Sequence, residues 1–274
     1  MTKRVIIALS SDFGIALAKD WLAEGHEVIG TYRRRTPALE GLKDAGARLV
    51  ECDLTDKASL ARAGKELTAL ATGWEVLVQA SGVQDPVGLF ADSNFDQWEA
   101  SIGANFLSPL RLVHGLLPLR DTAAANGPMV LFFAGGGTNN ATLNYSAYTI
   151  SKIASIKMCE LLDAEMPQTR FAIVGPGWVK TKIHEATLEA GSRAGANYER
   201  TLAMLAGENC VSMERVVDCV NWAIASPRDV IGGRNISLVH DAWGDPSLDG
   251  LLRANPDFYK LRRAGNDALI AKPL

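Results

Sequence analysis

Short apolar runs alternate along this chain with longer amphipathic segments. Most of the runs are continuously apolar, which is typical of strands buried on both faces of a parallel sheet. The pattern predicts strands at residues 3–9, 27–32, 48–52, 75–80, 128–134, 170–175 and 235–239. Apolar residues at helical spacing predict helices near 14–24, 38–45, 56–71, 95–118, 150–165 and 212–225.

The alternation of strands and helices predicts the fold class. It implies an α/β fold, a Rossmann-type doubly wound parallel β-sheet of about seven strands flanked by helices. Thr36 followed by Pro37 marks one helix start, since proline is favoured at the first helical position. Residues 180–210 and the tail from 242 onward are predicted to be irregular. Each follows a predicted strand, where open α/β sheets place the segments that cover a ligand.

Length and composition agree with one large folded unit. The chain has 274 residues, with 28 basic and 31 acidic side chains, a formal net charge of −3 and 47% hydrophobic residues. This is an ordinary globular composition, and its slight acidity gives no electrostatic footprint for nucleic acid. No apolar run approaches the roughly 20 residues of a membrane span. We therefore expect neither nucleic-acid nor membrane partners.

Cysteine and histidine are sparse. The four cysteines form no C-x-x-C pair, and at this chain length reduced, buried thiols are expected rather than a disulfide framework. The four histidines have no metal-ligand spacing, so no metal site is predicted. Together these features favour a cytoplasmic protein.

The turn after the first predicted strand is a candidate phosphate-binding site. A pyrophosphate needs a tight turn, close approach of the backbone and a free helix N-terminus, which three glycines normally supply. Only Gly14 is in place, because Ala8 and Asp12 occupy the other two positions. A carboxylate beside a pyrophosphate is repulsive unless it points away, and Asp12 is also open to interpretation as a helix cap. By itself the turn leaves dinucleotide binding undecided.

The end of the second predicted strand favours one dinucleotide over another. NAD-binding folds place an acidic residue here to bind the ribose 2′-hydroxyl. This chain has no acid between Glu27 and Glu40 and carries Arg33, Arg34 and Arg35 instead. An arginine fork suits a 2′-phosphate, which predicts NADP(H) rather than NAD(H), although a solvated basic loop would have the same composition.

Several motifs, in order, resemble the short-chain dehydrogenase/reductase family over residues 3 to about 241. They are the turn ending in Gly14, Asp53, Gln79-Ala80-Ser81-Gly82 in the position of an Asn-Asn-Ala-Gly motif, Asn105, Tyr148-x-x-x-Lys152, Pro176-Gly177 and the closing segment from Gly232 to Asp241. The resemblance implies a single domain at 1–241, with 180–210 as a substrate lid and 242–274 as a C-terminal extension. It also implies a homodimer or homotetramer assembled through paired helices at 95–118 and 148–165.

The resemblance further assigns residues to the cofactor. Those expected to contact NADP(H) are Ala8, Ser10, Ser11, Asp12, Phe13, Gly14, Arg33, Arg34, Asp53, Leu54, Ala80, Ser81, Gly82, Lys152, Pro176, Gly177, Val179 and Thr181.

Tyr148 and Lys152 form the predicted catalytic pair. Their spacing of four residues places them on one face of a helix. Reduction of a carbonyl needs a proton donor at the forming alkoxide, and a nearby ammonium is expected to lower the tyrosine pKa from 10 by about 2–3 units. The resemblance implies that Tyr148 is the acid or base and that Asn105 supports a water chain. Tyr145 would compete only in another register, because it has no lysine four residues on.

One element of the family pattern is missing. A serine usually lies thirteen residues before the tyrosine and binds the substrate oxygen, but position 135 is glycine. Losing one such donor typically costs about 10²–10³ in rate. Thr138, Asn139 or backbone N–H groups of the run from Gly135 are candidate replacements. Alternatively, the site has lost catalysis and kept nucleotide binding, or the glycines only allow close packing.

The predicted lid indicates the kind of substrate. It carries basic residues and few large apolar ones, which favours a polar, sugar-like or anionic small molecule. These basic residues are Lys180, Lys182, His184, Arg193 and Arg200. The leading hypothesis is an NADP(H)-dependent oxidoreductase acting on a carbonyl or secondary alcohol. The alternatives are a non-catalytic NADP(H)-binding regulatory protein and an epimerase or dehydratase of the same family.

Overall fold

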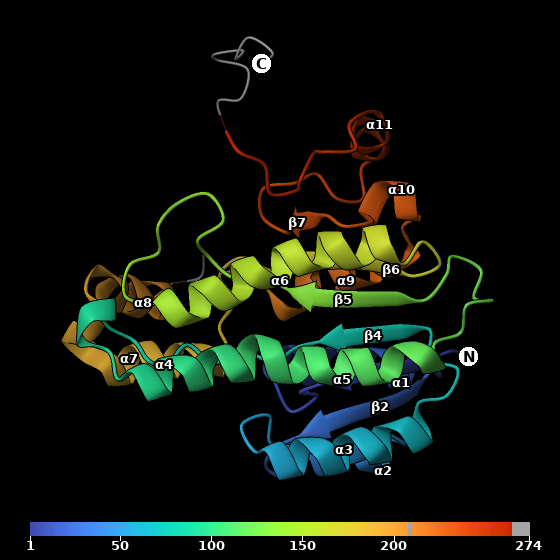
Figure 1. Ribbon diagram of the computed structural model, residues 1–274, viewed down its shortest axis with the longest axis horizontal. Coiled ribbons are helices and arrows are strands. Elements are labelled where there is room, and N and C mark those ends of the chain that lie inside the picture. Colours follow the sequence, from blue (N-terminus) through green and yellow to red (C-terminus); the bar gives the residue numbers. More distant parts are fainter. Residues whose placement is uncertain (208–209, 265–274) are drawn as a thin grey trace, which may run out of the picture.

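All the predicted strands are present in a seven-stranded parallel sheet. The computed structural model describes residues 1–207 and 210–264. The strand order is β3-β2-β1-β4-β5-β6-β7, the doubly wound order (Figure 1). The strands are β1 (Lys3–Ile7), β2 (Glu27–Tyr32), β3 (Arg48–Glu51), β4 (Val76–Gln79), β5 (Met129–Phe133), β6 (Arg170–Gly175) and β7 (Asn235–Ser237). The fold-class prediction is therefore confirmed.

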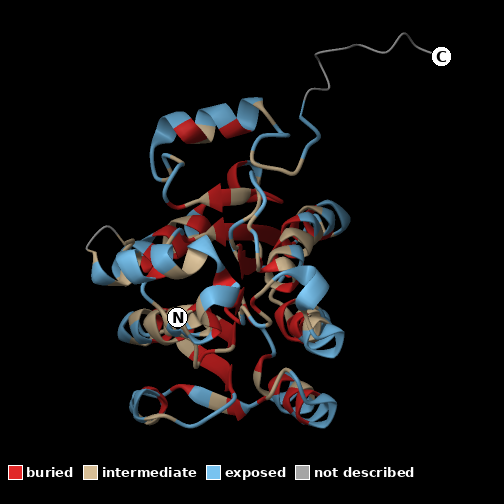
Figure 2. Ribbon diagram, turned by 90° about the vertical axis from the view of Figure 1, so that its left-hand side faces the viewer, coloured by how far each residue is buried: buried red, intermediate tan, exposed pale blue. Residues whose placement is uncertain are grey.

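Each face of the sheet is covered by helices, and Figure 2 shows the buried strands between the two layers. Successive residues of a strand point to opposite faces, so in β1 Ile6 packs in one core while Val5 and Ile7 pack in the other. The first core is completed by α1 (Asp12–Ala23), α2 (Pro37–Asp44) and α9 (Met213–Ala225). The second is completed by α3 (Lys57–Leu70), α5 (Ser108–Leu116) and α6 (Ser146–Glu165). Burial on both faces explains the continuously apolar runs.

The predicted helix at 95–118 is interrupted. It consists of α4 (Phe95–Ile102), a π-helical segment at Gly103–Leu107 and α5. π-Helical segments are rare and frequently mark functional sites. This one contains Asn105, one of the predicted catalytic residues.

The prediction that 180–210 is irregular is wrong. After a short turn the chain forms α7 (Glu185–Ala190) and α8 (Ala196–Ala206), and Figure 1 shows both at the end of the sheet to which the strands point. Both helices are short and bury few side chains, so they leave little periodicity in the sequence. Residues 208–209 of this segment lie outside the described residues.

The tail also contains regular structure, contrary to the prediction. The chain passes through α10 (Arg228–Ile231) and β7 before it enters the tail. The tail then forms α11 (Pro246–Ala254), which packs into the first core. The buried Arg234 donates hydrogen bonds to the carbonyl oxygens of Leu252, Asn255 and Phe258. The predicted extension also includes residues 265–274, which lie outside the described residues.

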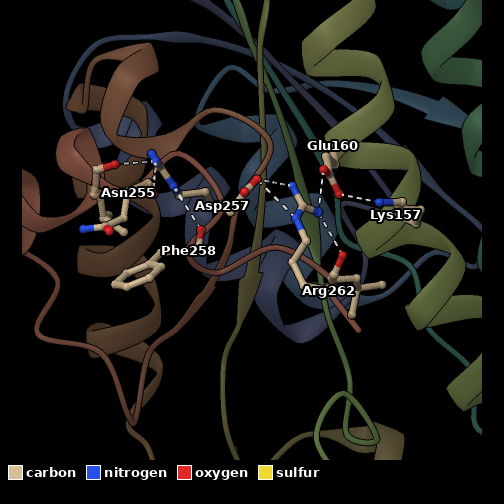
Figure 3. Close-up of polar contacts among 9 residues, drawn as sticks. Lys157, Glu160, Asn255, Asp257, Phe258 and Arg262 are labelled. Atoms are coloured by element: carbon tan, nitrogen blue, oxygen red, sulfur yellow. Dashed lines mark hydrogen bonds and ion pairs between the residues drawn. The ribbon is translucent and has the colours of Figure 1, made fainter. Parts of the chain in front are cut away.

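A second arginine fastens the end of the described tail to α6. Figure 3 shows Arg262 between Asp257 and Glu160, with ion-pair distances of 2.7 and 2.8 Å. The backbone N–H of Asn235 donates to the carbonyl oxygen of Tyr259 at 2.8 Å. The extension therefore lies along the β7 edge and against α6.

The described part of the chain carries no helix long and apolar enough to cross a bilayer. Within the same residues, no three His, Cys, Asp or Glu side chains gather closely enough to hold a metal ion. All four cysteines are free thiols, and Cys52, Cys159 and Cys219 are buried, as predicted.

Candidate active site

A large cavity runs across the carboxyl ends of the strands. Its volume of about 1820 Å³ exceeds the roughly 300–1,000 Å³ of a site for one drug-sized ligand, so it has room for a dinucleotide and a second molecule. All the residues predicted to bind the cofactor or to act in catalysis, except Gly14, line it. These are Ala8, Ser10, Ser11, Asp12, Phe13, Arg33, Arg34, Asp53, Leu54, Ala80, Ser81, Gly82, Asn105, Gly135, Thr138, Asn139, Tyr148, Lys152, Pro176, Gly177, Val179 and Thr181.

The turn between β1 and α1 keeps the tight geometry that glycines normally provide. Ala8 adopts φ +62°, and its backbone N–H donates to the Thr31 hydroxyl at 2.8 Å. Gly14 lies outside the cavity because it packs beneath the turn, where a Cβ atom would lie 2.6 Å from the carbonyl oxygen of Leu9. Gly14 is therefore a packing requirement of the turn and not a contact residue.

Asp12 is not the helix cap. Ser11 is the N-cap of α1, and its hydroxyl accepts from the Gly14 N–H at 3.0 Å. The Asp12 carboxylate instead accepts from the backbone N–H of Lys182 at 2.9 Å. This contact turns the carboxylate toward the chain that follows β6 and joins the first turn to the start of the lid.

Two of the three predicted arginines line the cavity. Arg33 and Arg34 do so near Asp53, whereas Arg35 pairs with Glu40 at 2.8 Å and does not contact the cavity. Hydrogen bonds from Thr55 hold the pKa of the Asp53 carboxyl below its usual value, and the charges of Arg33 and Arg34 act in the same direction. This end of the cavity therefore presents two cations to an anionic group.

Tyr148 and Lys152 lie together on α6, at the other end of the cavity. The Lys152 ammonium is 5.7 Å from the centre of the Tyr148 ring. It donates to the carbonyl oxygens of Ser81 and Phe133 at 3.2 and 3.1 Å. Burial lowers the Lys152 pKa to about 8 and raises the Tyr148 pKa to about 12.

The expected lowering of the Tyr148 pKa is therefore wrong for the chain by itself. The Lys152 nitrogen faces carbonyl oxygens and does not hydrogen-bond the phenol, so loss of hydration dominates the Tyr148 pKa. The phenol consequently carries its proton at neutral pH.

The ring of Tyr148 fills the place of the missing serine side chain. A Cβ atom on Gly135 would lie 2.7, 2.8 and 2.9 Å from the Cε1, Oη and Cζ atoms of Tyr148. Thr138 and Asn139 line the cavity near this point. Within the described chain, the backbone N–H groups from Gly135 to Asn139 have no hydrogen-bond acceptor. They are therefore available as donors.

Asn105 holds the segment after β4 in place. Its side-chain oxygen accepts from the Val83 N–H at 2.8 Å, and its amide nitrogen donates to the Val83 carbonyl oxygen at 2.9 Å. Upstream, the Gln79 amide donates to the Ser81 hydroxyl at 2.5 Å. These contacts fix the loop whose Ser81 carbonyl accepts from Lys152.

The charged residues of the lid only partly match the prediction. Lys182, His184 and Arg200 line the cavity, whereas Lys180 and Arg193 do not. Glu185 and Glu189 line the same wall, so the lid presents both signs of charge. His184 stacks on Trp178 with ring centres 3.9 Å apart, and its Nε2 donates to the Val179 carbonyl oxygen at 2.9 Å.

The sequence analysis gives no role to a group of polar side chains that meet in the cavity near the start of α6. The hydroxyl of Tyr145 lies 2.7 Å from that of Thr187, which donates to the side-chain oxygen of Gln84 at 3.1 Å. Thr187 and Gln84 are single polar residues in segments without a motif, and 103 residues separate them. The sequence therefore contains no signal for this contact.

Comparison with known proteins covers most of the chain. A family model described as short chain dehydrogenase matches residues 3–191. "Short chain dehydrogenase tazN" of Aspergillus terreus is 27% identical over 206 residues, covering 73% of this chain and 41% of that protein, so the chain spans about two fifths of its length. "Serine 3-dehydrogenase" of Rhizobium radiobacter is 25% identical over 234 residues, covering 82% of this chain and 89% of that protein.

A solved structure agrees in fold. A variant of actinorhodin polyketide ketoreductase with NADPH superposes with a TM-score of 0.73 at 18% sequence identity. The superposition covers 86% of this chain and 97% of that one.

Proposed function

The chain belongs to the short-chain dehydrogenase/reductase family, and on that premise we propose that it is an NADP(H)-dependent oxidoreductase. It would transfer hydride between the nicotinamide and a carbonyl or secondary alcohol carbon of a small polar, sugar-like or anionic molecule. The observation that carries the proposal is a single cavity with Tyr148 and Lys152 at one end and Arg33 and Arg34 at the other. The adenosine and nicotinamide ends of a dinucleotide need those two environments.

The residues around the cavity fit NADP(H). Arg33 and Arg34 would hold a 2′-phosphate, and no carboxylate follows β2 to favour a free 2′-hydroxyl. The Asp12 carboxylate is turned toward Lys182, which reduces its repulsion of a pyrophosphate at the start of α1. When bound, the cofactor would supply or accept the hydride. NADPH is named with the ketoreductase structure above, which supports the same choice here.

Tyr148 would supply the proton in reduction. Its hydroxyl is neutral at pH 7, since a phenol ordinarily titrates near 10 and burial raises the Tyr148 pKa further, to about 12. As a carbonyl oxygen gains charge, the Tyr148 O–H bond breaks and the proton passes to that oxygen. The resulting phenolate would be stabilised by the Lys152 ammonium, and Asn105 would keep the Val83 loop in place. In oxidation the same groups act in reverse.

The donors that replace the missing serine would come from the loop after β5. We propose that backbone N–H groups between Gly135 and Asn139 hydrogen-bond the substrate oxygen, with Thr138 or Asn139 side chains as the alternative. The variants Thr138→Val and Asn139→Leu remove the side-chain donors and so separate the two alternatives. Retained turnover supports the backbone donors, whereas a loss of about 10²–10³ in rate assigns the role to the side chains.

The first experiment is a fluorescence titration of the purified protein with NADPH and NADH. We expect NADPH to bind at least tenfold more tightly than NADH, and the preference to disappear in the double variant Arg33→Ala/Arg34→Ala. Arg35→Ala is the matched control, because Arg35 pairs with Glu40 and does not line the cavity. Failure of both nucleotides to bind would refute the proposed cofactor.

Gly135, in the position of the family's serine, favours a second candidate, a non-catalytic NADP(H)-binding regulatory protein. A Tyr148→Phe variant separates the candidates, since it abolishes turnover by an oxidoreductase and leaves a regulatory protein unaffected. An epimerase or dehydratase would depend on Tyr148 but convert substrate without net consumption of NADPH.

We also propose a homodimer or homotetramer in the cytoplasm, assembled through α5 and α6. Leu107, Ile150 and Leu161 lie on these helices or immediately before them and are 58%, 53% and 46% exposed, which supports an apolar contact surface there. Light scattering after size-exclusion chromatography would give the oligomeric state.

A further inference from the structure

The substrate end of the cavity is closed by contacts that catalysis does not explain. Three segments meet there: the loop after β4, the start of α6 and the lid helix α7. Each contributes one polar side chain to a chain of hydrogen bonds, and all three side chains line the cavity. They are Gln84, Tyr145 and Thr187.

The direction of these hydrogen bonds is fixed by chemistry. The side-chain oxygen of Gln84 can only accept, so the single hydrogen of the Thr187 hydroxyl is donated to it at 3.1 Å. Tyr145 must then donate to the Thr187 oxygen, over 2.7 Å. The Thr187 hydroxyl thus accepts from Tyr145 at the start of α6 and donates to the β4 loop, so it is used both as an acceptor and as a donor.

The Tyr145–Thr187 hydrogen bond is shielded from water, and the Thr187–Gln84 bond is partly buried. Tyr145 and Thr187 are 4% and 1% exposed, and burial raises the pKa of the Tyr145 phenol. Tyr145 also packs with Val87, Ala190 and Ala194 in a small apolar cluster beneath the lid. A buried hydroxyl that loses its partner is strongly unfavourable, so the three segments are held together as one unit.

This unit adjoins the catalytic pair. Tyr145 immediately precedes α6 and lies three residues before Tyr148. Gln84 lies two residues after Gly82, which is close to both catalytic side chains. A Cβ atom on Gly82 would lie 3.8 Å from the Lys152 nitrogen and 4.0 Å from Cε2 of Tyr148. A displacement of α7 would therefore alter the walls next to the reacting groups.

We propose that Tyr145 and Thr187 are positioning residues, which hold the lid helix α7 and Gln84 against the start of the catalytic helix. Their role in turnover rests on the proposed function, since it is the substrate of that reaction that the lid encloses. The hydrogen bond from Thr187 uses only the side-chain oxygen of Gln84. Within the described chain the amide nitrogen of Gln84 has no partner, so its N–H₂ group would be a donor to the substrate.

The test compares matched variants of the full-length protein. Thr187→Val keeps the shape and removes the hydroxyl, Thr187→Ser restores a hydroxyl, and Tyr145→Phe removes only the donor. Gln84→Glu keeps an acceptor for Thr187, whereas Gln84→Leu does not. Hydrogen exchange over residues 185–194 measures how firmly the lid is held.

We expect exchange to accelerate at least tenfold, equivalent to about 1.4 kcal/mol, in Thr187→Val, Tyr145→Phe and Gln84→Leu. Thr187→Ser and Gln84→Glu should exchange like the wild type. Unchanged exchange in Thr187→Val, or equal acceleration in Thr187→Ser, would overturn the proposal, because the hydroxyl would then not hold the lid.

A kinetic readout separates positioning from simple stability. With NADPH and glyceraldehyde as the polar carbonyl probe, Thr187→Val should raise KM at least fivefold while kcat changes less than twofold, and Thr187→Ser should restore KM. A fall in kcat with unchanged KM would overturn the positioning role. If the wild type neither binds NADPH nor reduces the probe, the proposed function fails, and the exchange measurement alone decides whether the three residues hold the lid.

Discussion

Replacing Lys152 with methionine should change how the stability of the protein depends on pH. The ammonium is buried among protein atoms, and burial lowers its pKa from 10.5 to about 8. At 1.36 kcal/mol per pKa unit, this difference corresponds to about 3 kcal/mol of folding free energy opposed by the buried charge. Methionine has a similar length and carries no charge to bury.

The sign follows from proton binding. Between pH 8 and 10.5 the unfolded chain retains a proton that folded Lys152 has released, so raising the pH through this window favours the folded protein. Below pH 8 both states are protonated and the full penalty remains. Relative to Lys152→Met, the unfolding free energy of the wild type should therefore rise by about 2 kcal/mol between about pH 7 and pH 9.5.

Urea unfolding of both proteins at several pH values measures this difference. Loss of the hydrogen bonds to Ser81 and Phe133 in the variant shifts the difference by a constant and leaves its slope unchanged. Titration of the Cys52 thiol, whose pKa burial raises, affects both proteins alike and cancels. A pH-independent difference for Lys152→Met would refute the burial argument.

Three further predictions concern other parts of the chain. Ala8→Gly should stabilise the fold by about 1 kcal/mol, because it relieves the positive φ, and urea unfolding should show the opposite sign for Ala16→Gly within α1. Gly135→Ser should lower turnover at least tenfold with unchanged NADPH affinity, because the new Cβ atom displaces Tyr148; improved turnover would contradict this. Burial and the Arg4 guanidinium, 2.6 Å away, lower the His26 pKa below its ordinary value of 6.5. The unfolding free energy should therefore fall as the pH drops below 6.5, because the unfolded chain then binds a proton more readily, and it should fall less in His26→Gln.

The sheet could be predicted because each strand's apolar run is a local feature of the sequence. Strands such as β1 and β5 are buried on both faces and leave uninterrupted apolar runs, whatever their neighbours. The predicted residues at the strand ends meet in one cavity for the same reason, since a parallel sheet brings its carboxyl ends to one edge. Of the residues assigned to the cofactor or to catalysis, Gly14 alone does not line the described cavity, because its role is to pack under the turn.

The features that were missed depend on distant contacts. The lid helices α7 and α8 are stabilised by a few buried residues from other segments, so their own sequence shows weak periodicity. The Tyr148 pKa depends on which atoms the Lys152 nitrogen faces, and spacing on a helix does not determine that. Asp12 contacts Lys182, which is 170 residues away, and only the folded chain reveals that its carboxylate is turned aside.

The arginine beneath the tail determines how the protein can be shortened. Arg234 is 3% exposed, and three of its acceptors, the carbonyl oxygens of Leu252, Asn255 and Phe258, lie beyond the segment that resembles other family members. Truncation of the chain after residue 241 would leave this cation without those partners and remove Leu248 and Leu252 from the first core. The end of the family resemblance is therefore not the end of the cooperative folding unit, and the described tail and the sheet should melt in a single transition.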